Sequence, residues 1–156
     1  MRWTRSSSHG FTFIELVMAT AIMMILASAA LPLARVSVRR QKENDLHRVL
    51  REVRTCIDLY KATAEINRIP QDMANENYPV SLDVLVNGVP YNNDVTGRKF
   101  KCLRKIPIDP VTGTTDWGLR SYNDPPDAKS WGGQNVFDLY SKAEGLALDG
   151  TKFKDW

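Results

Sequence analysis

Apolar residues are spread unevenly along the chain, and their longest block begins at residue 11. Residues 11–34 contain one charged side chain, Glu15. A helix of about 20 apolar residues spans a bilayer, so we expect residues 11–34 to cross a membrane. The ten residues before this block are polar and include Arg2 and Arg5. Positive charge holds that end in the cytoplasm, which places the rest of the chain outside.

A helical pattern continues beyond this block. Apolar residues recur at a spacing of about 3.6 on one face of a helix, namely Leu46, Val49, Leu50, Val53, Ile57, Tyr60 and Ala64. Pro70 disfavours helical geometry in the residue before it, so we expect an amphipathic half over residues 35–69. Pro32 should kink the helix or open one turn.

Turn signals become frequent after Pro70. Residues 81–86 predict a short helix capped by Ser81, and residues 120–122 and 135–140 are candidate strands. We therefore expect an α+β fold, in which a long N-terminal helix packs on a small C-terminal antiparallel sheet of roughly two to four strands. Residues 70–156 form the head of this fold.

Composition and charge exclude several classes of protein. A chain of 156 residues suits one small domain, and a net charge of +3 is too small to indicate nucleic-acid binding. His9 precedes the apolar block and His47 stands alone, so no His-centred catalytic group is present and we expect no enzyme. Cys56 and Cys102 form one disulfide in an oxidising compartment or remain two free thiols, and both alternatives stay open.

Residues 10–15, Gly-Phe-Thr-Phe-Ile-Glu, stand between the charged leader and the apolar helix. An ordinary secretory signal is cut after its apolar core, and Ala27-Ser28-Ala29 fits such a cut. Against it, a carboxylate at the centre of an inserted helix costs about 2.5–3.5 kcal/mol, and cutting after Ala29 removes half of the helix. The run GFTFIELV instead resembles the class III signal of type IV pilins and type II secretion pseudopilins.

This resemblance implies a set of processing and assembly residues. A prepilin peptidase would cut between Gly10 and Phe11, removing residues 1–10 as a leader, and Phe11 would be N-methylated. Pro32 matches the proline that these helices carry. Glu15 lies one helical turn from the new amino group, and we expect it to pair with its own N-terminus or with Phe11 of a neighbouring subunit during assembly.

Later blocks resemble one branch of the family, the G-type major pseudopilin of type II secretion. They occur in that branch's order: Tyr78-Pro79, residues 106–110, residues 136–141 and Asp155-Trp156. The branch binds calcium through an acid-rich C-terminal loop, and calcium takes about six to eight oxygen ligands. This chain offers few carboxylates there, so we expect no tight site and at most a weak one at Ser141, Glu144, Asp149 and Asp155.

The resemblance implies a single-pass protein of the bacterial inner membrane with its head in the periplasm. Copies of the chain would polymerise into a periplasmic pseudopilus that drives protein export through a type II secretion system. The implied partners are minor pseudopilins, the prepilin peptidase, an inner-membrane assembly platform and the membrane; no cofactor is required. The alternatives are a type IV pilus or competence pilin, a secreted soluble domain cut after Ala29, and a membrane-tethered enzyme.

Overall fold

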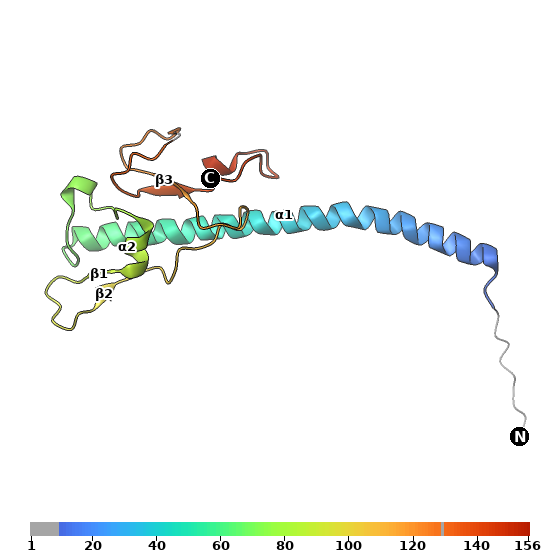
Figure 1. The fold of residues 1–156 in the computed structure, drawn as a ribbon, viewed down its shortest axis with the longest axis horizontal. Helices are drawn as coiled ribbons and strands as arrows, with labels where there is room; N and C mark the ends of the chain where they lie inside the picture. Colours follow the sequence, from blue (N-terminus) through green and yellow to red (C-terminus); the bar gives the residue numbers. More distant parts are fainter. Residues whose placement is uncertain (1–9, 129) are drawn as a thin grey trace, which may run out of the picture. The chain divides into compact units, whose positions relative to one another are not determined.

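The computed structural model describes residues 10–128 and 130–156, with no side-chain detail for residues 29–33. Nearly all of the expected leader, residues 1–10, lies outside the described residues. The chain divides into two compact units, Met1–Arg39 and Arg40–Trp156, which are described in turn. Helix α1, Phe13–Glu65, contributes residues to both units and is drawn as one continuous helix in Figure 1.

In the first unit, α1 starts immediately after Thr12. The Glu15 N–H donates to Thr12 Oγ1 over 3.3 Å, and the Leu16 N–H donates to the Thr12 carbonyl over 3.1 Å. Threonine is a favoured residue at the start of a helix because its hydroxyl accepts from an otherwise unbonded N–H. Thr12 followed by Glu15 also has the spacing of a capping box.

The large apolar side chains of the first helical turns are exposed. Phe13 is 84 % exposed and Met23 is 69 % exposed, with similar values for their neighbours Ile14, Leu16, Met18, Ile22, Met24, Ile25 and Leu26. Among the described residues, no helical stretch combines the length and the apolar character needed to pass through a bilayer.

We expected either a kink or an open turn at Pro32; the helix continues through Pro32 without an interruption, so the open turn does not form. Proline removes one main-chain donor, but the helical turns on either side sustain the helix cooperatively. The side chains of Pro32 and of Ala29, the residue at the alternative cut, lie outside the described part of the chain.

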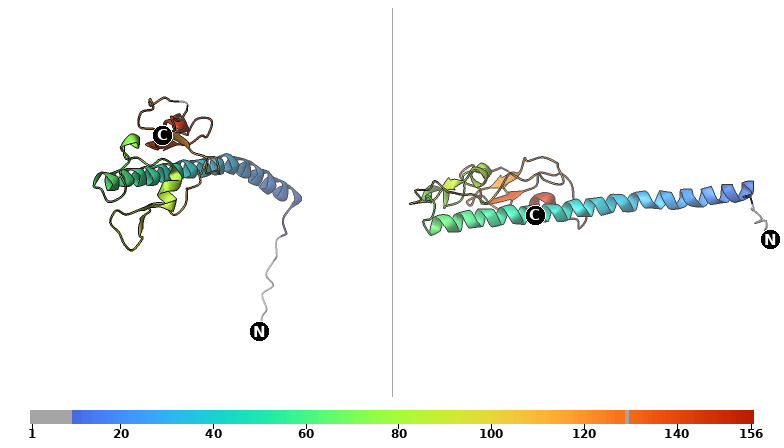
Figure 2. Two further views of the ribbon diagram at one scale, coloured as in Figure 1. Left: turned by 60° about the vertical axis from the view of Figure 1, so that its left-hand side comes forward. Right: turned by 90° about the horizontal axis from the view of Figure 1, so that it is seen from below.

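In the second unit, the predicted apolar stripe of α1 forms the core. Leu46, Leu50, Val53 and Ile57 are at most 1 % exposed, which confirms the prediction from helical spacing. They pack against apolar side chains from the remainder of the unit, among them Ile69, Leu82, Leu85, Phe100, Leu103, Trp117, Val136, Leu139 and Phe153. In the right-hand view of Figure 2 these later elements lie along one side of this half of α1.

The helix ends at Glu65, earlier than the end at residue 69 predicted from Pro70. Asn67 adopts a left-handed conformation with φ 57°, and its N–H donates to the Ala64 carbonyl over 2.8 Å. Asparagine tolerates this conformation better than most residues and commonly ends helices in this way. The Gln71 side chain also donates to the Ala64 carbonyl over 3.0 Å, so this carbonyl at the helix end has a second hydrogen-bond donor.

The strands form two separate antiparallel pairs: β1 Val89–Pro90 with β2 Lys99–Phe100, and β3 Gly118–Arg120 with β4 Asp138–Tyr140. The α+β fold class is therefore correct, although the expected single sheet is two sheets. The run predicted at residues 120–122 is displaced to β3, and the one at 135–140 contains β4. Gly118 lies opposite Tyr140, and a side chain at position 118 would run into the Tyr140 ring.

Three short helical segments complete the unit: η1 Met73–Asn75, α2 Leu82–Asn87 and η2 Phe153–Asp155. Helix α2 confirms the helix predicted over residues 81–86 and buries Leu85 completely. Ser81 stands at the predicted cap position, but its side chain makes no capping hydrogen bond. Packing of the apolar face against the core therefore holds this short helix in place.

Candidate functional site

Gly10 and Phe11, the predicted cleavage and methylation positions, are exposed just before α1. The Phe11 side chain is 81 % exposed. Among the described residues, a Cβ atom placed on Gly10 would have no other heavy atom within 4 Å, and Gly10 has no left-handed backbone angle. The folded chain itself thus gives no reason for glycine here, so a requirement for glycine would come from a binding partner.

Glu15 is exposed in the first turn of α1. The N-terminal turn of a helix carries partial positive charge, which favours an acidic side chain at this place. Thr12 belongs to the same helix start and was missed in the sequence analysis. The Thr12-to-Glu15 spacing was the signal that could have identified it.

Cys56 on α1 and Cys102 after β2 form a disulfide in the structure, with their Cα atoms 5.7 Å apart. This distance lies in the ordinary range for disulfides. The N–H groups of Cys102 and Leu103 both donate to the Leu85 carbonyl, so α2 is attached at the same point. Of the two alternatives for the cysteines, the structure contains the disulfide.

Two of the residues considered for a calcium site, Ser141 and Asp149, have other contacts. Ser141 is fully buried and its hydroxyl donates to Asp109 Oδ2 over 2.5 Å. Asp149 accepts from the Thr151 hydroxyl over 2.7 Å and from the Thr151 N–H over 2.9 Å, and these bonds lower the pKa of Asp149. Within the described ranges, no three acidic, His or Cys side chains are grouped as metal ligands. The weak calcium site at Ser141, Glu144, Asp149 and Asp155 stays a prediction.

Asp109 is a buried polar residue whose role the sequence analysis missed. One carboxylate oxygen accepts from the Val111 N–H over 2.7 Å, and the other accepts from Ser141. Aspartate commonly hydrogen-bonds the backbone two residues further on in such turns. The bond to Ser141 then fixes residues 109–114 against the end of β4.

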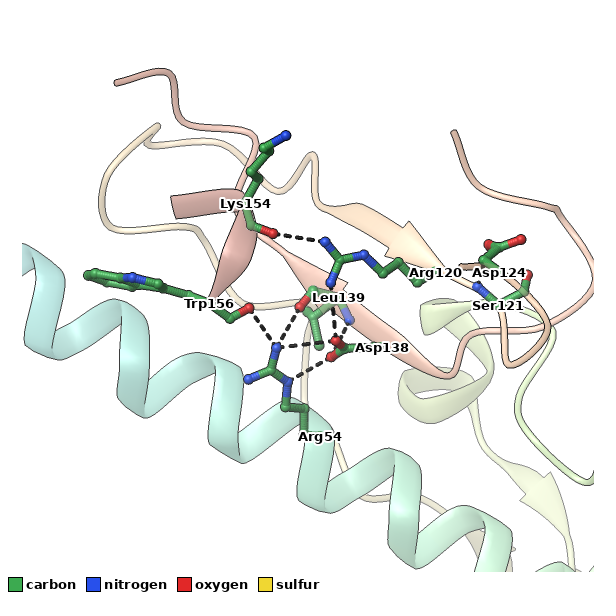
Figure 3. A network of polar contacts seen from close by, with 8 residues as sticks. All are labelled: Arg54, Arg120, Ser121, Asp124, Asp138, Leu139, Lys154 and Trp156. Carbon is green, nitrogen blue, oxygen red and sulfur yellow. Dashed lines mark hydrogen bonds and ion pairs between the residues drawn. The ribbon is translucent and has the colours of Figure 1, made fainter. Parts of the chain in front are cut away.

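Arg54 connects α1 to the last part of the chain, as Figure 3 shows. Its guanidinium donates to both oxygens of Asp138, over 2.7 and 3.3 Å, and to the main-chain oxygen of Trp156 over 2.7 Å. Arg120 lies on the other side of Asp138, 3.7 Å away, and donates to the Lys154 carbonyl over 2.9 Å. Planar guanidinium groups suit such paired contacts, so this cluster attaches β3, β4 and η2 to α1.

Comparison with known proteins identifies one feature, at the N-terminal end. Residues 5–31 match the family described as "Prokaryotic N-terminal methylation motif". No curated protein and no solved structure matches the chain. The match covers the segment that contains Gly10, Phe11 and Glu15, so the chain carries the prepilin signal of type IV pilin-like proteins.

Proposed function

We propose that this chain is a pilin-like structural subunit that assembles, after leader removal, into a helical filament. The observation that carries the proposal is the methylation motif at residues 5–31, followed by a helix whose large apolar side chains are exposed. Exposed apolar surface of this extent is typical of interaction or membrane sites. The helix would rest in the inner membrane before assembly, and equivalent helices of other copies would then replace the lipid.

Within this class, the proposed system is type II secretion, with the chain as a pseudopilin of a periplasmic filament. The support is the order of the sequence blocks in the head, from Tyr78-Pro79 to Asp155-Trp156. The cluster around Arg54 attaches the last of these blocks to α1, which would give each subunit a firm head for packing in the filament. Minor pseudopilins, a prepilin peptidase and an assembly platform are its proposed partners.

The processing step gives a direct test. The intact mass of membrane-extracted protein is expected to correspond to a chain that starts at N-methylated Phe11. Gly10→Val should abolish this processing, because a β-branched side chain would obstruct a peptidase groove shaped around a residue without one, while the folded chain leaves free space there. A mature chain that starts at Ala30, or one that keeps Met1, would contradict the proposal.

The choice of system is tested in a strain that lacks the chain. We expect exoproteins to accumulate in the periplasm while long surface fibres, viewed by electron microscopy, stay unchanged. Complementation with the unaltered chain should restore secretion, and complementation with Gly10→Val should not. Loss of surface fibres or of DNA uptake with normal secretion would assign the chain to a type IV or competence pilus instead.

A further inference from the structure

Glu43 is a buried carboxylate on the second half of α1, only 7 % exposed. Both of its side-chain oxygens accept from the Leu148 N–H, over 3.0 and 3.2 Å. Burying a charged group is costly unless hydrogen bonds replace those it made to water. A main-chain donor held against a buried carboxylate therefore fixes the position of the loop that supplies it.

That loop, residues 142–152, also has main-chain hydrogen bonds within itself, next to Leu148. The Ala147 N–H donates to the Thr151 carbonyl over 2.8 Å, and the Gly150 N–H donates to the Ala147 carbonyl over 3.0 Å. Ala147 is 6 % exposed and packs in the core, whereas Leu148 presents its N–H to Glu43. The turn is thus preorganised, and Glu43 attaches it to α1.

A second contact one helical turn along α1 strengthens this attachment. His47 lies four residues after Glu43, on the same face of the helix, and its ring stacks on the Trp156 ring with centroids 3.9 Å apart. The Trp156 indole N–H donates to the Thr151 hydroxyl over 2.6 Å. Thr151 therefore connects the loop to Trp156, and both are held against neighbouring turns of α1.

The surroundings of the loop are unsuited to a cation. A hollow of about 350 Å³ beside it is lined by Lys142, Lys152 and Lys154 together with Glu144 and Ser141. The Lys142 ammonium is paired with Asp116 over 2.6 Å, which leaves two ammonium groups and one carboxylate, a balance that disfavours a divalent cation. Calcium also needs several carboxylate or carbonyl oxygens.

We propose that the C-terminal loop is ordered without a metal ion and that Glu43 is the residue that positions it. The carboxylate takes the structural place of a bound cation, since it joins the loop to the rest of the head at one buried point. The anchoring concerns the head alone, so it holds whether or not the chain assembles into filaments.

Trypsin cleavage of the full chain in detergent tests this proposal, because Lys142 and Lys152 are exposed at either end of the loop. For the unaltered chain, cleavage rates at both lysines should be equal with a calcium chelator and with added calcium. In Glu43→Ala, these rates should rise roughly tenfold or more, since a lost hydrogen bond to a charged group lets the loop open more often.

Glu52→Ala, an exposed acid on the same helix, is the matched control and should cleave like the unaltered chain. Cleavage after Lys99 in β2 rises only if the whole head unfolds, so it distinguishes local loosening from global unfolding. Glu43→Gln keeps one acceptor oxygen, and its loop cleavage rate should lie between those of the unaltered chain and Glu43→Ala. Protection of the loop by calcium would show that a metal holds it and overturn the proposal. Equal loop cleavage in Glu43→Ala and Glu52→Ala would also overturn it.

Discussion

Filaments containing Glu15→Ala are expected to fall at least a hundredfold in yield, while leader cleavage and membrane insertion continue. Glu15 is the one charge in the apolar segment, and its proposed partner is the amino group of Phe11 on the neighbouring subunit. Removing one member of a buried charged pair leaves the other unpaired, at a cost of about 3–5 kcal/mol. Filaments sheared from cells or membranes and quantified by immunoblot measure the effect.

The substitution leaves the main-chain hydrogen bond at the helix start in place. Thr12 accepts from the main-chain N–H of residue 15, which alanine also supplies. Glu15→Asp keeps the charge on a shorter side chain and should be partly defective, while Thr12→Ala should weaken the helix start without removing the charge. Normal filament yield from Glu15→Ala would exclude charge pairing as the assembly mechanism, whatever the fold.

Loss of the Cys56–Cys102 disulfide should lower the free energy of unfolding of the head by about 4 kcal/mol in the chain-entropy model. The bond closes a loop between residues 46 apart, and it joins α1 to the segment that follows β2. The measurement is urea unfolding of the full chain in detergent, with tryptophan fluorescence, to which the buried Trp117 contributes, as the signal. The double variant Cys56→Ala/Cys102→Ala is compared with the unaltered chain.

Because Cys56 is itself buried, the double variant also loses some packing. Reductant added to the unaltered chain removes the bond but keeps both side chains, so it provides the matched control. Alkylation of both thiols without reductant, or an unfolding midpoint that reductant does not shift, would contradict this prediction.

Helical spacing was enough to predict the core face of α1, because seven apolar positions repeat one period over five turns. The fold class also needed the turn signals and candidate strands after Pro70. The strands were harder to locate, since segments of two or three residues are too short to show alternation and β1 even contains Pro90. The helix end was displaced because Asn67 supplied a local stop before Pro70 could act.

The N-terminal signal was identified from sequence because its residues are contiguous. Arg54 and Glu43, which attach the C-terminal part of the head to α1, were not identified from sequence because their partners are distant in the chain. Arg54 and Asp138 are 84 residues apart, and Glu43 and Leu148 are 105 apart. A lone glutamate on a helix looks like a solvated residue until the loop that covers it is placed. The same holds for Asp109, whose partner Ser141 lies 32 residues further on.

These distant anchors have a consequence for the newly made chain. Closing contacts between residues so far apart is slow, because the intervening chain must first lose its freedom. The head therefore cannot close until residue 148 has left the ribosome, and α1 stays uncovered until then. If the head is exported as proposed, a chain that folds this late would remain open enough to pass through a translocation channel, and its head and the Cys56–Cys102 disulfide would form on the far side.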